Sequence, residues 1–133
     1  LSQNNILHLC GGSVSYLASL LREKDIADII VDAVRKESII YTGTSAGSMV
    51  VSEDLSMLSY DDEEEKEYVK NGFDRKGLGL IKFGIVPHCN STDFAEEHKK
   101  VAGQMIENSQ ALIFLHDNQA IWVENDKFKI IEV

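Results

Sequence analysis

The stretch Ser38-Ile39-Ile40-Tyr41-Thr42-Gly43-Thr44-Ser45-Ala46-Gly47 decides the fold of this chain. An apolar run typical of a β-strand leads into Gly-x-Ser-x-Gly, and a stretch compatible with a helix follows. A serine in this context lies on a sharp strand-to-helix turn that exposes its hydroxyl above a sheet. The amide of Ala46, the first after the serine, then points to where an oxyanion would form. An ordinary strand–glycine–helix junction has the same pattern, so the rest of the chain must distinguish the two.

Short apolar strands alternate with amphipathic helices along the 133 residues, which suggest one domain spanning residues 1–133. This alternation predicts an α/β fold with a mostly parallel sheet, flanked by helices on both faces and closed by a C-terminal β-hairpin. We expect strands at 5–10, 38–42, 85–88 and 111–115, alternating apolar residues at 77–83, and a hairpin of 120–124 and 127–133. We expect helices at 14–21, 25–35, 46–52 and 92–108, and a polar connection at 54–73 that is partly helical.

The composition excludes several classes of function. The formal net charge of −9 disfavours binding to a nucleic-acid backbone, and no apolar run is long enough to span a membrane. No signal peptide is visible. Cys10 and Cys89 show neither a disulfide framework nor the spacing of metal ligands. We therefore expect a cytoplasmic protein without a metal or organic cofactor.

Four chemical candidates fall just past predicted strand ends: Gly11-Gly12, Ser45, His88 and Asp117. Active sites of parallel sheets lie outside the carboxyl ends of the strands. A serine hydroxyl needs an adjacent base, and the base needs an acid that orients it. His88 follows a strand and Pro87 on this edge, so it is the preferred base.

The other histidines fit other roles. His116 lies at a strand end and is a reserve base. His8, within a strand, favours a packing role, whereas His98, within a helix, favours packing or a surface position. Asp117 follows an apolar strand, so its position is well defined. Asp61 is the alternative acid, but it lies in the acidic run 61–65, which we expect to face solvent. Gly12 could supply a second oxyanion amide through close approach of its backbone.

At this point the chain resembles the peptidase E family, the serine peptidases that include aspartyl dipeptidase and cyanophycinase. The resemblance rests on four ordered segments: Cys10-Gly11-Gly12-Ser13, Gly43-Thr44-Ser45-Ala46-Gly47, Val86-Pro87-His88 and Leu115-His116-Asp117. It implies a fold similar to class I glutamine amidotransferases, of the flavodoxin-like type. It also implies that Ser45 is the nucleophile, His88 the base and Asp117 the acid, with oxyanion amides from Gly12 and Ala46. In some members the acid lies downstream of the serine, which here would be near Asp61.

Three departures from the family pattern modify these expectations. Ser13 stands where an asparagine usually follows the glycine pair. No arginine follows His88, where aspartyl dipeptidases carry one that pairs with the substrate's aspartate, so strict specificity for N-terminal aspartate is not predicted. The chain also starts without methionine and enters a strand almost at once, which suggests that an N-terminal portion is missing. We expect homo-oligomer formation to cover the face that this loss exposes.

Two kinds of function are compatible with these features. The first is a serine peptidase that hydrolyses small peptides in the manner of a dipeptidase. The second is an inactive fragment or pseudo-enzyme with a binding or regulatory role, which the shortened N-terminus favours. A different acyl hydrolase, such as an esterase, could use the same three residues.

Overall fold

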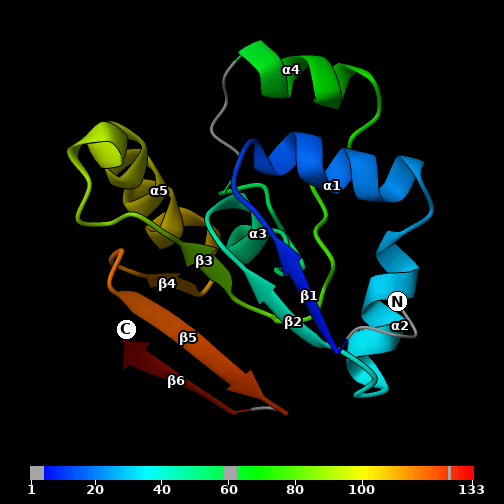
Figure 1. Ribbon diagram of the computed structural model, residues 1–133. Coiled ribbons are helices and arrows are strands. Elements are labelled where there is room, and N and C mark those ends of the chain that lie inside the picture. The colour runs from blue at the N-terminus through cyan, green and yellow to red at the C-terminus, as the bar shows by residue number, and fades with distance from the viewer. Residues whose placement is uncertain (1–4, 59–62, 126) are drawn as a thin grey trace.

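The computed structural model describes residues 5–58, 63–125 and 127–133. Within these ranges strands and helices alternate as the hydrophobic pattern predicts (Figure 1). The elements are β1 (Ile6–Leu9), α1 (Val14–Glu23), α2 (Ala27–Arg35), β2 (Ile40–Gly43), α3 (Ala46–Met49), α4 (Glu63–Lys70), β3 (Gly84–Val86), the 3-10 turn η1 (Thr92–Phe94), α5 (Ala95–Asn108), β4 (Leu112–Phe114), β5 (Gln119–Glu124) and β6 (Lys127–Glu132). The chain is therefore a mixed α/β structure.

The strands pair two by two. β1 and β2 are parallel, with Leu9 opposite Gly43, and β3 and β4 are parallel, with Val86 opposite Phe114. β5 and β6 form the predicted antiparallel hairpin. In the described residues these are three two-stranded sheets, so the pairing does not extend to one continuous parallel sheet. Parallel pairing nevertheless brings the ends of β1 and β2 together, and likewise those of β3 and β4, which is where the chemical candidates lie.

The segment 77–83, which carries alternating apolar residues in the sequence, belongs to none of the strands that the structure describes. It makes only an isolated bridge, between Ser52 and Ile81. The amides of Leu78 and Leu80 donate instead to the carbonyls of Val50 and Val51, at 2.7 and 2.9 Å. Because these carbonyls lie at the end of α3, the segment wraps around that helix and cannot extend a sheet.

The centre of the hydrophobic core is the segment 50–58, which follows the turn at Ser45. Val50, Leu55 and Leu58 are fully buried. Residues from α1, α2, β3, α5 and β4 pack around them: Val14, Ala18, Leu21, Ile30, Val86, Val101 and Leu112. On α1 the buried positions Val14, Ala18 and Leu21 recur at helical spacing. Burial of this segment from several sides stabilises the turn that carries Ser45.

Serine side chains cap the starts of α1 and η1. The Ser13 side chain accepts a hydrogen bond from the Tyr16 amide at 3.2 Å, so Ser13 is the N-cap of α1. The helix expected over 92–108 begins instead as η1, where the Ser91 hydroxyl accepts from the Asp93 amide, and continues as α5. A 3-10 turn is common at a helix start, and this one follows the short turn after His88.

Apolar side chains remain exposed on the outer face of β1 and β2. Ile6 and Ile40 are opposite each other in the register and are 61% and 57% exposed. His8, on the same face, is also exposed, and its Nδ1 lies 2.8 Å from the Thr42 hydroxyl. The packing role expected for His8 is therefore wrong, because alternation along β1 turns it outward. None of the described helices combines the length and apolar character that a membrane crossing needs.

Candidate active site

Ser45 lies on a strained turn between β2 and α3. Its φ of 52° and ψ of −122° fall outside the regions that non-glycine residues normally occupy. Such a conformation costs about 1–3 kcal/mol and persists only where the surroundings enforce it. Here the Ser45 carbonyl accepts hydrogen bonds from the Ser48 hydroxyl at 2.6 Å and from the Met49 amide at 3.1 Å. The turn is thus held from within α3, with the serine side chain directed out of the helix start.

The two motif glycines are required by backbone contacts. A Cβ at Gly43 would lie 2.2 Å from the Gly47 carbonyl oxygen, and a Cβ at Gly47 would lie 2.1 Å from that of Leu9. Both distances are far below contact distance, so neither position accepts a side chain. The elbow is therefore packed against β1 as well as β2.

Gly11 and Gly12, which follow β1, have different structural roles. A Cβ at Gly11 would lie 3.0 Å from the Ser45 Cβ, so this backbone passes directly beside the serine. Gly12 has open space around its Cβ position, but its φ of 134° is strained for any other residue. The close approach expected of the pair is therefore made by Gly11, and Gly12 provides the turn.

Tyr41 supports the elbow from β2. Its hydroxyl donates to the Gly47 carbonyl at 2.6 Å, and burial raises the pKa of the phenol, which keeps it a donor. We expect Tyr41→Phe to lower the free energy of unfolding by about 1 kcal/mol, since the half-buried carbonyl loses its partner. Urea denaturation of the variant measures this loss. Tyr16→Phe, at an exposed position, is the control and should change stability by less than about 0.5 kcal/mol.

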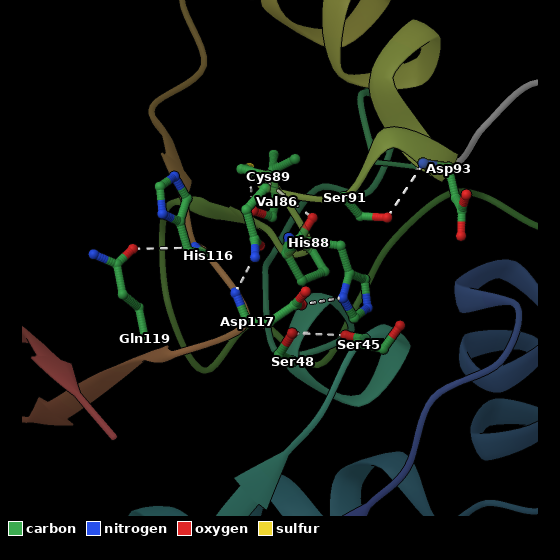
Figure 2. Close-up of polar contacts among 12 residues, drawn as sticks. Ser45, Ser48, Val86, His88, Cys89, Ser91, Asp93, His116, Asp117 and Gln119 are labelled. Carbon is green, nitrogen blue, oxygen red and sulfur yellow. Dashed lines mark hydrogen bonds and ion pairs between the residues drawn. The ribbon is translucent and has the colours of Figure 1, made fainter.

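His88 and Asp117 meet at the ends of β3 and β4. His88 Nδ1 lies 2.6 Å from Asp117 Oδ1. An ionised carboxylate can only accept a hydrogen bond, so Nδ1 is the protonated nitrogen and Nε2 is left as an acceptor. Figure 2 shows the Asp117 carboxylate on one side of the His88 ring and the Ser45 side chain beneath the ring. The structure thus brings Ser45, His88 and Asp117 to one place.

No direct hydrogen bond joins Ser45 to His88 in the part of the chain that the structure describes. In unliganded sites such bonds are often long and shorten only when substrate binds. The His88 backbone has a φ of 64°. The Gly84 amide donates to the Ala111 carbonyl, and the Cys89 amide donates to the Leu115 carbonyl. From the first bond to the second, the strand that leads to His88 advances five residues, whereas the neighbouring strand advances only four. His88 therefore lies in a one-residue bulge, which aims its side chain at the site.

Phe94 and Asn90, which no sequence motif singles out, contact the His88–Asp117 pair. The Phe94 ring stacks on the His88 ring, with centroids 5.2 Å apart and planes 20° from parallel. The Asn90 side-chain oxygen accepts from the Asp117 amide at 2.9 Å. In the sequence, Phe94 is marked only by lying within the helix expected over 92–108, and Asn90 belongs to no motif. Their proximity to His88 in sequence was the only available signal.

Cys89 is not an alternative nucleophile. Desolvation raises the pKa of its thiol, and the Asp117 charge adds to this effect. The Sγ also lies 3.2 Å from the Val86 carbonyl, to which the thiol donates. A protonated thiol is a poor nucleophile compared with its thiolate.

The remaining candidates lie away from this group or outside the described residues. His98 is buried on α5 beside Phe94, in agreement with a packing role, and His116 is exposed with its amide bonded to the Gln119 side chain. Asp61 lies outside the described residues. Among the described residues, no group of His, Cys, Asp and Glu could hold a metal ion.

Comparisons with known proteins show which proteins the chain is similar to. Two curated relatives are similar over most of the chain: "Uncharacterized peptidase Lmo0363" from Listeria monocytogenes, 24% identical over 92% of this chain and 58% of the relative, and "Uncharacterized peptidase Lin0382" from Listeria innocua, 22% identical over 96% and 59%. The chain thus spans about three fifths of the length of these relatives.

A solved structure shares the fold. The crystal structure of a "Putative Peptidase E Protein" from Listeria monocytogenes EGD-e superimposes with a TM-score of 0.84 at 20% identity, covering 98% of this chain and 61% of that chain. The model of Peptidase family S51 matches residues 1–131. Since this match extends over nearly all 133 residues, the chain belongs to Peptidase family S51.

Proposed function

We propose that this chain is the catalytic part of a serine peptidase that hydrolyses small peptides in the manner of a dipeptidase. The observation that carries the proposal is the convergence of a strained serine turn and a His–Asp pair at 2.6 Å. In this proposal Ser45 is the nucleophile, His88 the general base and Asp117 the orienting acid. The mostly parallel sheet with helices on both faces, of the glutamine amidotransferase-like type, is part of the same proposal.

The chemistry follows from the acceptor at His88 Nε2. The Ser45 hydroxyl attacks the scissile carbonyl carbon while Nε2 takes its proton, and Asp117 stabilises the imidazolium through Nδ1. The carbonyl oxygen becomes an oxyanion, to which the amides of Gly12 and Ala46 donate. Collapse breaks the C–N bond as Nε2 returns the proton to the leaving amine. Water then repeats the two proton transfers and releases the acid from Ser45.

The test is hydrolysis of a panel of unblocked dipeptides and tripeptides by the 133-residue chain. We expect release of free amino acids, detected by an amine assay, and loss of this release in His88→Ala. The panel includes a simple ester, because an esterase with the same three residues would hydrolyse the ester and leave every peptide intact. Hydrolysis of the ester alone would therefore replace the peptidase assignment by a different acyl hydrolase.

We expect no strong preference for N-terminal aspartate. The segment 89–100 after His88 contains no arginine, and Lys99 is already paired with Glu96 at 2.6 Å. The net charge of −9 also disfavours attraction of an acidic substrate. The kcat/KM for Asp-Leu should therefore lie within about threefold of that for Ala-Leu, a difference below 1 kcal/mol. A preference for Asp-Leu above about tenfold, or 1.4 kcal/mol, would show that another cation recognises the aspartate.

A further inference from the structure

The contact between His88 and Asp117 is too exposed to hold its own geometry. The two side chains are 32% and 51% exposed. Ion pairs in such settings contribute about 0–1 kcal/mol, because water competes for both partners and the side chains lose freedom. Yet a triad acid must keep the imidazole ring in one orientation. A second interaction on the Asp117 backbone would therefore help to hold the acid in place relative to the base.

The backbone ladder between β3 and β4 ends just short of the acid. The Leu115 amide donates to the Val86 carbonyl at 2.9 Å, and the Cys89 amide donates to the Leu115 carbonyl at 3.0 Å. A regular parallel ladder would next pair the Asp117 amide with a backbone carbonyl of the neighbouring strand. In the register set by the bond from the Cys89 amide to the Leu115 carbonyl, that partner would be the Cys89 carbonyl, but the Asp117 amide donates to a side chain instead. The His88 carbonyl accepts from the Ser91 amide at 2.9 Å, in the turn that follows the bulge.

The Asn90 side chain takes the place of that missing carbonyl. Its Oδ1 accepts from the Asp117 amide at 2.9 Å. A backbone amide can only donate, so the atom that faces it must be the oxygen and not the nitrogen of Asn90. Asn90 is two residues after His88, so one side chain ties the loop that carries the base to the backbone of the acid.

We propose that Asn90 is a positioning residue that sets the geometry of the His88–Asp117 pair. This inference rests on the proposed function and adds Asn90 to the residues on which that function depends. Asn90 touches neither Ser45 nor the His88 ring through a hydrogen bond in the described residues, and it acts through the Asp117 backbone. Its loss would let the acid drift from Nδ1 while leaving the substrate contacts in place.

The test is a double-mutant cycle of Asn90→Ala and Asp117→Ala, with kcat and KM measured on the best dipeptide. We expect Asn90→Ala to lower kcat roughly tenfold or more, because small misplacements of a catalytic group are costly, with KM changed less than about twofold. In the Asp117→Ala background, the same substitution should change kcat by less than about twofold, since the group it positions is gone. Asn90→Asp retains an oxygen acceptor and should recover kcat to within about threefold.

Asn118→Ala is the matched control, because it removes the same kind of exposed side chain, here from the loop that carries Asp117 itself. It should leave kcat unchanged. Equal losses from Asn90→Ala with and without Asp117 would overturn the inference, and so would a wild-type kcat in Asn90→Ala.

A second measurement tests the tether without turnover. The exchange of the Asp117 amide proton with solvent should be at least about tenfold faster in Asn90→Ala than in the wild type and unchanged in Asn118→Ala. An inactive wild type with a protected Asp117 amide would contradict the proposed function while the tether stands. An active wild type whose Asp117 amide exchanges equally fast in Asn90→Ala would overturn the tether and leave the proposed function in place.

Discussion

Ser45→Ala should lower kcat for peptide hydrolysis by roughly 10⁴-fold or more without unfolding the protein. The substitution removes the attacking oxygen but keeps the Cβ that lies beside Gly11. The residual rate would come from the oxyanion amides and from substrate binding, which remain. Steady-state kinetics on the best dipeptide, together with a urea unfolding curve, measure both quantities.

Ser52→Ala is the matched control for this substitution. Ser52 is likewise a serine close to α3, but it is fully buried and its hydroxyl has no hydrogen-bond partner in the described residues. Removing that hydroxyl should leave kcat unchanged and should not lower stability, since an unsatisfied buried polar group is costly. Comparable activity of Ser45→Ala and Ser52→Ala would show that hydrolysis does not depend on Ser45.

Gly47→Ala should destabilise the fold by at least about 3 kcal/mol, at or above the upper end of ordinary overpacking. The new methyl would lie 2.1 Å from the Leu9 carbonyl oxygen and 2.6 Å from its carbon, and backbone atoms cannot move aside as a side-chain end can. Relief would require β1 to separate from the elbow, which would also disturb Ser45. Urea denaturation should show a large fall in the transition midpoint, accompanied by loss of hydrolysis.

Gly103→Ala is the control for Gly47→Ala, and we expect it to stabilise the fold. Gly103 lies within α5, and nothing lies within 4 Å of its Cβ position. Alanine favours a helix interior over glycine by roughly 0.5–1 kcal/mol, so this variant should be more stable than the wild type by about that amount. A Gly47→Ala protein as stable as Gly103→Ala would contradict the close packing of the elbow against β1.

The parts of this fold that depend on local periodicity could be predicted from the sequence. The strand–turn–helix around Ser45, the Ser13 cap and the C-terminal hairpin all follow from spacing and from turn chemistry. The segment 77–83 could not, because its alternating apolar residues suit a strand and a wrapped loop equally. Its form depends on the long-range bonds to Val50 and Val51.

The candidate site, like the fold, could be predicted from the sequence only in part. Ser45, His88 and Asp117 each follow a strand, so the topology alone predicts that they lie near one edge. Tyr41, Asn90 and Phe94 act through contacts that only the folded backbone creates, such as the bulge at His88. The exposure of Ile6 and Ile40 accords with an uncovered sheet face, and homo-oligomer formation stays a prediction.

The most direct test of the central claim is covalent labelling of the folded chain with a fluorophosphonate, followed by peptide mass spectrometry. A strained elbow with an adjacent His–Asp pair activates one serine above all others, so we predict a single adduct on Ser45. The adduct should be absent in Ser45→Ala and should form at least about 10²-fold more slowly in His88→Ala, since general-base assistance contributes at least that much. A folded chain that shows no adduct, or one that is modified equally on other serines, would contradict the claim that Ser45 is an activated nucleophile.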